Sequence, residues 1–177
     1  TLSLNLSPTF FNNHLTVNLN GKGIYAKNRF ADNGAIGAAV SYDPTQSVYD
    51  SNGINGYRVW MLNGAPNTMA TLNPVALLEQ KKDKSTVKRF VGNAQFDYNF
   101  FNIPGLRANL NLGLDYSTSD GNVDIPTNSE QSLHDKVQNG SGLHTDYSQT
   151  RRDQSLEYYM NYVKEVSSIQ SKFDVMA

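Results

Sequence analysis

The feature that most constrains this chain is a one-by-one alternation of apolar and polar residues, sustained over several long runs. Successive side chains of an extended strand point to opposite faces, so a period of two predicts strands with one apolar and one polar face. About six such runs are present: Leu2–Ser7, Leu15–Tyr25, Phe90–Phe100, Leu106–Tyr116, Leu156–Tyr162 and Phe173–Ala177. The pattern therefore predicts an all-β fold.

The connections between these runs alternate between short and long. Residues 8–13, 101–105 and 166–170 form short turns, whereas 26–86 and 117–155 are long and rich in Asn, Gly, Ser and Asp, the residues typical of loops. Short turns at one end and long loops at the other are typical of bacterial outer-membrane barrels. Within the first long loop, Asn73 before Pro74 predicts the start of a short helix.

The strands of a soluble β-sandwich also alternate between apolar and polar residues, but two details favour a barrel. The runs Phe90–Phe100 and Leu106–Tyr116 each take ten residue steps, which at about 40° of tilt spans about 25 Å, the height of the apolar band of such a barrel. Aromatic residues gather near the ends of the runs, as interfacial girdles do. We therefore expect residues 1–177 to be part of an antiparallel transmembrane β-barrel, with about six strands, long extracellular loops and short periplasmic turns.

Composition argues against several other functions. The formal net charge is -1 and cysteine is absent, so neither nucleic-acid binding nor a disulfide or Cys-ligated metal site is indicated. His14, His134 and His144 lack metal-ligand spacing, and the acidic segment 115–124 departs from a calcium loop, so we interpret it as the polar start of a loop. No nucleophile elbow or paired-carboxylate arrangement is present. We expect no enzyme activity and no cofactor.

Several segments in order resemble the SusC/RagA family of TonB-dependent outer-membrane transporters. The first, Asn28–Asp50, carries an Ala-Ile-x-x-Ala element followed by Asp-Pro-Thr and a Tyr. The others follow in the family's order: Asn73–Ala76, Arg89–Asn93, Pro104–Leu106, Asn111–Asp115 and Leu156–Tyr162. The resemblance covers nearly the whole chain.

This resemblance implies import of glycans or peptides across the outer membrane of Bacteroidetes-type bacteria. It also implies contact with outer-membrane lipid, a SusD-like surface lipoprotein as a lid, and energy from TonB. No segment here resembles a plug domain, a TonB-contacting segment or a signal peptide, so TonB coupling is expected through other parts of a parent chain. The alternative from another class is a secreted glycan-binding β-sandwich or an adhesin.

Two groups of residues are candidates for function. Aromatic residues in the polar first loop have no strand face to bury them, so they could contact a ligand or the lid, or else pack the loop against itself. Polar residues at alternate strand positions are expected to face the barrel lumen and to offer hydrogen bonds to a plug or solute. The loop group is Tyr42, Asp43, Tyr49, Tyr57 and Trp60, and the lumen group is Asn18, Asn93, Gln95, Asn109 and Asn111.

We also expect that this chain does not function alone. Thr1 stands at the start of one alternating run and Ala177 within another. A sheet of about six strands would expose two unpaired edges in lipid, and about eight strands is the smallest single-chain barrel known. The missing strand pairs would come from the rest of a parent chain or from other copies.

Overall fold

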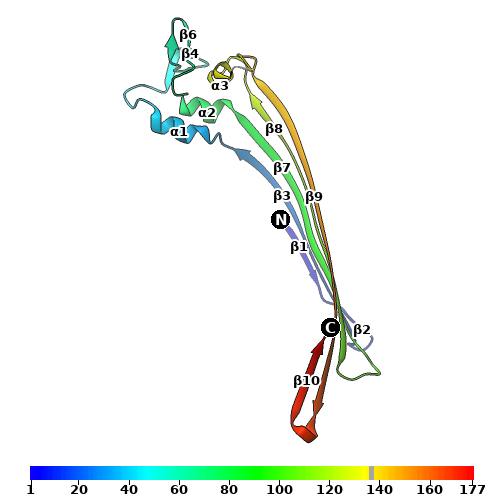
Figure 1. The fold of residues 1–177 in the computed structure, drawn as a ribbon. Helices are drawn as coiled ribbons and strands as arrows, with labels where there is room; N and C mark the ends of the chain where they lie inside the picture. The colour runs from blue at the N-terminus through cyan, green and yellow to red at the C-terminus, as the bar shows by residue number, and fades with distance from the viewer. Residues whose placement is uncertain (136–137) are drawn as a thin grey trace. The chain divides into compact units, whose positions relative to one another are not determined.

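The structure is a computed structural model that describes residues 1–135 and 138–177. Its main feature is one large, mostly antiparallel sheet whose strands follow each other in the order β1-β3-β7-β8-β9-β10, with the short β2 paired to β3 (Figure 1). The strands are β1 Leu2–Leu6, β2 Thr9–Phe10, β3 Leu15–Phe30, β7 Lys82–Asn99, β8 Leu106–Ile125, β9 Leu143–Val166 and β10 Ser171–Met176. The all-β fold and the six principal strands predicted from the alternation are confirmed.

The loop boundaries predicted from the sequence are wrong. The first loop was expected from about 26 to 86 and the second from about 117 to 155, but β3 reaches Phe30 and β7 begins at Lys82, while β8 reaches Ile125 and β9 begins at Leu143. Residues 115–124, interpreted as the polar start of a loop, belong to β8 instead. In these extensions the faces of the strands are mostly polar, or the alternation changes phase as it does in β8 after Ser119, so the pattern is lost in the sequence although the backbone stays extended.

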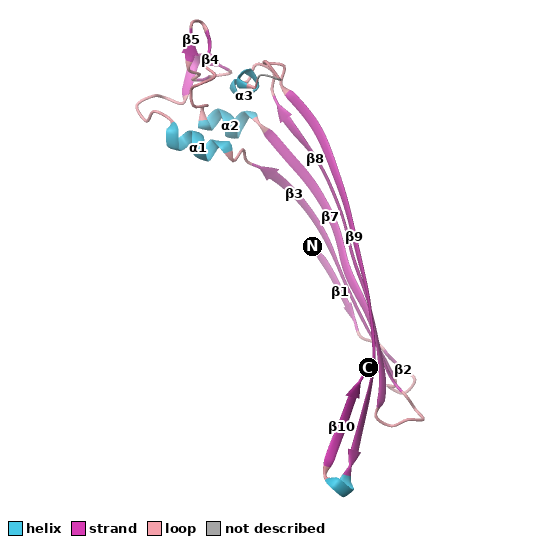
Figure 2. Cartoon of the chain, in the orientation of Figure 1, coloured by secondary structure: helices cyan, strands magenta, loops and turns pink. Residues whose placement is uncertain are grey.

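The chain divides into two compact units. Unit 1 contains Thr1–Ala26, Val87–Ser119 and Gln149–Ala177, and unit 2 contains Lys27–Thr86 and Asp120–Ser148. Unit 1 consists of sheet and the short turns. Unit 2 adds the helices α1 Gly34–Ser41, α2 Pro74–Gln80 and α3 Glu130–His134, and the short strands β4 Tyr49–Ile54, β5 Met61–Leu62 and β6 Ala65–Pro66 (Figure 2).

The register of unit 1 gives the sheet one apolar face. Leu2, Leu4 and Leu6 of β1 lie opposite Gly23, Gly21 and Leu19 of β3. Residues that lie opposite each other in a ladder share a face, so the alternating leucines collect on one side. This face is open: the side chain of Leu2 is 79% exposed and that of Leu156 is 70% exposed.

The backbone conformation of the turn between β2 and β3 explains why asparagines stand there. Phe11, Asn12 and Asn13 all have positive φ angles, of 53°, 50° and 68°. Asparagine adopts this left-handed conformation more readily than most residues. The other short connection beyond the turn at 101–105 is a 3-10 turn, Ser167–Ile169, before β10.

Unit 2 has a small core of its own, formed by two helices. Ala35 and Ala38 of α1 pack with Leu77 of α2, and Leu72 covers the cluster. Among the described residues, no helix is both long and apolar enough to cross a membrane. The helix α2 was predicted from Asn73 and Pro74, whereas α1 lies in a segment expected to be loop.

Asn73 holds the loop segments of unit 2 together and is fully buried. Its side-chain oxygen accepts hydrogen bonds from the N–H groups of Val75 and Ala76, which caps α2. Its side-chain nitrogen donates to the carbonyls of Val48, at 2.6 Å, and Arg58, at 3.1 Å. One amide therefore satisfies the start of a helix and two strand-like segments that precede it.

We expect Asn73→Ala to destabilise unit 2 by about 2–4 kcal/mol, because it removes a helix cap and the side-chain donor to two partly buried carbonyls, of which Val48 keeps the N–H of Arg58. Hydrogen exchange of the α2 amides measures this loss of protection. Asn52→Ala is the matched control, since Asn52 is an exposed asparagine of the same unit. Equal protection in the two variants would contradict this role for Asn73.

Candidate functional site

A ladder of amide side chains crosses four strands of unit 1. Asn20 of β3 donates to Asn93 of β7 at 3.0 Å, Asn93 donates to Asn111 of β8 at 3.3 Å, and Asn111 donates to Glu157 of β9 at 3.4 Å. These residues lie on the face opposite the leucines. Each amide uses one donor in the ladder and keeps further hydrogen-bonding capacity for other groups.

The five residues predicted for the lumen share this polar face. Asn18 precedes Asn20 by two residues, Gln95 follows Asn93 by two, and Asn109 precedes Asn111 by two, so strand geometry places all of them on one side. Asn109 is only 2% exposed and donates to Asp97 at 2.8 Å. The structure thus brings the predicted polar residues together, and that they line a lumen stays a prediction.

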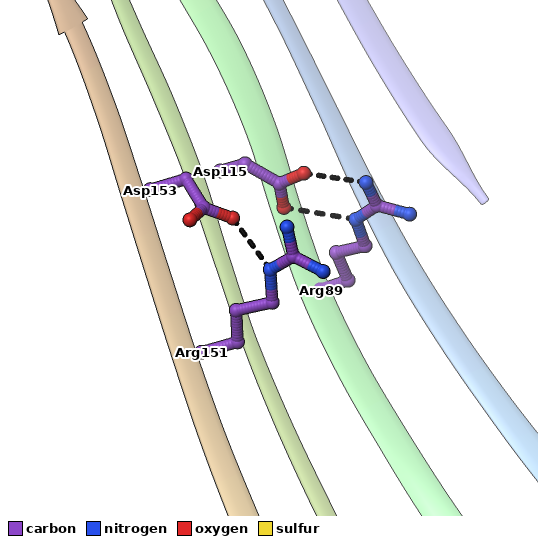
Figure 3. Close-up of polar contacts among 4 residues, drawn as sticks. All are labelled: Arg89, Asp115, Arg151 and Asp153. Carbon is purple, nitrogen blue, oxygen red and sulfur yellow. Dashed lines mark hydrogen bonds and ion pairs between the residues drawn. The ribbon is translucent and has the colours of Figure 1, made fainter.

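Charged residues continue the same face, and the sequence analysis did not single them out. Arg89 of β7 makes a two-pronged ion pair with Asp115 of β8, and the Nε of Arg151 donates to Asp153 at 2.6 Å within β9 (Figure 3). The sequence could have placed them on this face, because all four have the same strand parity as the amides of their strands. Bidentate guanidinium–carboxylate pairs hold their geometry better than single contacts.

The predicted loop residues form two aromatic pairs in unit 2. The rings of Tyr42 and Trp60 have centroids 6.2 Å apart, and those of Tyr49 and Tyr57 are 5.7 Å apart. Asp43 caps a turn by accepting from both the N–H and the hydroxyl of Thr45. Part of the cluster packs against itself, while Tyr49 remains 58% exposed and open to a ligand or partner.

The hydroxyl of Tyr57 is held by a hydrogen bond to Glu79, at the end of α2. This bond to a carboxylate, together with burial, raises the pKa of Tyr57 to about 12, so the ring stays neutral and its O–H remains a donor at physiological pH. The contact fixes one aromatic pair to a helix.

A shallow pocket of about 460 Å³ in unit 2 was not predicted. It is lined by the α1 residues Gly37 and Ala38 together with Asp32, Gln131 and His134. Burial acts to raise the pKa of Asp32, but hydrogen bonds from the N–H of Gly34, from Lys81 and from Gln131 bring it below its usual value. The carboxylate is therefore ionised and already engaged. No three His, Cys, Asp or Glu side chains in residues 1–135 and 138–177 are placed to hold a metal.

Comparison with known proteins identifies a relative. No protein-family model matches the chain. The TonB-dependent receptor SusC of Bacteroides thetaiotaomicron is 33% identical to it over 193 aligned positions, which cover 99% of this chain. The chain is SusC-like. It spans 18% of the length of SusC, and the resemblance to the SusC/RagA family predicted from its residues is confirmed.

In this SusC-like chain, one carboxyl links the second loop of unit 2 to the first. Glu130, at the start of α3, is 2% exposed and accepts a 2.8 Å hydrogen bond from the backbone N–H of Asn73. Burial raises the pKa of Glu130 to about 7, and the hydrogen bond from Asn73 offsets only part of that rise. The charge on this link therefore changes close to neutral pH.

We expect the stability of unit 2 to fall as the pH rises from about 4.5 to about 7. In that interval Glu130 is ionised in the unfolded chain and protonated in the folded one, so folding takes up a proton. A rise in pH therefore disfavours the folded state. Glu130→Gln keeps an acceptor for Asn73 and removes the charge. At pH 8 it should be more stable than the native chain by on the order of 3 kcal/mol.

Hydrogen exchange of the α2 and α3 amides at several pH values, corrected for the intrinsic pH dependence of exchange, tests this. Asp120→Asn, at an exposed carboxylate of the same unit, serves as the control and should leave the pH dependence in place. A pH dependence in Glu130→Gln equal to that of the native chain would refute the assignment.

Proposed function

We propose that this SusC-like chain is part of the wall of an outer-membrane β-barrel that imports glycans or peptides. The observation that carries the proposal is the pairing of two unlike faces on one sheet. An exposed row of leucines lies on one side and a hydrogen-bonded ladder from Asn20 to Glu157 on the other. A barrel wall needs this arrangement, because its outside contacts lipid and its inside contacts water, a plug or a solute.

The alternative, a secreted β-sandwich or adhesin, would bury the leucine face under a second sheet. Among the described residues, the sheet that accompanies the large one is the two-stranded β5-β6 pair, which belongs to unit 2. A sheet of two residues per strand is too small to cover Leu2, Leu4, Leu6 and Leu156. Lipid is the better cover for this face.

In this proposal the chain itself catalyses no reaction. Its polar face would line the lumen, with Asn18, Asn93, Gln95, Asn109 and Asn111 offering hydrogen bonds. Its loops would lie outside the cell, where Tyr42, Asp43, Tyr49, Tyr57 and Trp60 would meet a SusD-like surface lipoprotein or the solute. Energy from TonB would enter through other parts of the parent polypeptide, which would also supply the strands that close the barrel.

Two arginine substitutions at adjacent positions of β8 test which face meets lipid. Leu112→Arg in the full-length protein would place a charge in the apolar band and should cost about 2–4 kcal/mol, lowering the amount of assembled protein in the outer membrane. Asn111→Arg, one residue earlier, faces the polar side and is the matched control. Assembly impaired more by Asn111→Arg than by Leu112→Arg would show that the faces are reversed.

The loop cluster is tested by Trp60→Ala in the full-length protein. A central aromatic anchor typically contributes at least about 2 kcal/mol, so the affinity for the lid lipoprotein should fall roughly thirtyfold. Met69→Ala, at a side chain that is 91% exposed in the same unit, should leave the affinity unchanged. If both variants bind the lid as the native protein does, the contact lies elsewhere.

A further inference from the structure

The apolar face of unit 1 contains a trough of about 900 Å³. Three glycines at outward positions of β3 and β7, Gly21, Gly23 and Gly92, form its floor. Its walls are leucines of β1 on one side and of β8 and β9 on the other: Leu2, Leu4, Leu6, Leu112, Leu114 and Leu156. The trough exists because glycine has no side chain to fill this space.

The floor is open at Gly23, whereas the ring of Phe90 lies over Gly92, where an added Cβ atom would be 3.1 Å from it. A Cβ atom added at Gly23 would meet no heavy atom within 4 Å, and one at Gly21 would meet only the ring of Phe90, at 3.6 Å. Glycine inside a strand weakens it, and it often marks a place where a ligand or another backbone comes close. The open space at Gly23 is therefore better explained by an occupant than by the needs of the sheet.

One end of the trough carries a positive charge. A second hollow, of about 680 Å³, shares Leu2, Gly23 and Phe90 with the trough and is also lined by Tyr25, Lys88 and Tyr116. Lys88 has the strand parity of Phe90, so it lies on the apolar face, and it is exposed. Arg89 also borders this hollow, but its guanidinium pairs with Asp115 on the opposite face.

In the described part of the chain, no ion pair joins Lys88 to a carboxylate. Leucines and glycines thus lie at one end of the face, and the rings of Tyr25 and Tyr116 lie at the other end together with an ammonium group that has no anionic partner. An amphiphile with an apolar chain and an anionic head matches this order. A purely apolar partner would leave Lys88 unmatched.

We propose that the trough binds one acyl chain of an outer-leaflet membrane lipid whose phosphate is held by Lys88. This inference rests on the proposed function, because it requires the leucine face to meet lipid. The chain would lie along Gly21 and Gly23 between the leucine walls. The rings of Tyr25 and Tyr116 would lie at the level where the acyl chain meets the headgroup.

The test uses the full-length protein, purified in detergent and titrated with diphosphorylated lipid A, with bound lipid counted by native mass spectrometry. The same lipid without its phosphates is the second probe. Gly23→Leu places a side chain in the trough, where its Cβ meets no heavy atom within 4 Å, and Lys88→Gln removes the charge. Two controls match them: Gly37→Leu, at another glycine with open space, and Lys164→Gln, at an exposed lysine near the other end of β9.

We expect the native protein to retain one lipid A and Gly23→Leu to lower the affinity for both probes at least tenfold. Lys88→Gln should reduce binding of the phosphorylated lipid to the level of the dephosphorylated one, and both controls should bind as the native protein does. Equal binding by Gly23→Leu and the native protein, or a protein dimer formed through this face, would overturn the proposal. So would a phosphate preference that survives Lys88→Gln.

The outer-membrane fraction of the same cells separates this inference from the proposed function. Native protein that assembles in the outer membrane but retains no lipid A refutes the lipid site and leaves the barrel standing. Native protein absent from the outer membrane refutes the barrel, and the lipid site with it.

Discussion

The hydrogen-bond ladder between neighbouring strands is the constraint on which the rest of this chain depends. Neighbouring strands of the large sheet are hydrogen-bonded to each other from β1 to β10, so the two faces of the sheet need supply no partners for its backbone. The side chains can therefore make one face apolar and the other polar. The leucine row and the amide ladder are both consequences of a register that keeps odd and even positions apart.

Polar contacts, rather than apolar burial, organise unit 2. The apolar cluster of α1 and α2 contains Ala35, Ala38 and Leu77 with Leu72, which is small for a segment of this length. The two loops are joined where Glu130 accepts from Asn73, and the Tyr49–Tyr57 pair is joined to α2 where Tyr57 donates to Glu79. Such contacts are directional, so they hold loops in a defined arrangement without the dense packing of a large core.

The sequence predicted the strands where one face is apolar, and failed where both faces are polar or where the alternation changes phase. Leu106–Tyr116 was found, but as β8 continues to Ile125 the polar residues Asp120, Asn122 and Asp124 take the strand positions that the leucines hold before them. The helix α1 was missed because Gly34 and Gly37 are poor helix formers and its buried residues are only alanines. By contrast, α2 was predicted, since Asn before Pro is a local helix-start signal that needs no tertiary information.

The same distinction applies to the candidate site, where strand parity predicts the face of a residue but not its partners. Strand parity alone placed Asn93, Asn109 and Asn111 on one face, whereas the partners that bind them, such as Asp97 and Glu157, depend on which strands become neighbours and in what register. The pairing of Tyr42 with Trp60 depends on how the loop folds back on itself, for which the sequence carries no periodic signal.

The position of Asn73 has a chemical consequence over the lifetime of the protein. Asparagine loses its amide most readily when the backbone nitrogen of the next residue attacks the side chain, and a following glycine makes that attack easiest. Unit 2 contains five Asn-Gly pairs, at Asn33, Asn52, Asn55, Asn63 and Asn139. Asn73 is followed by Pro74, whose nitrogen carries no hydrogen. Ageing would thus convert these asparagines to acids first and spare the amide that holds the loops in place.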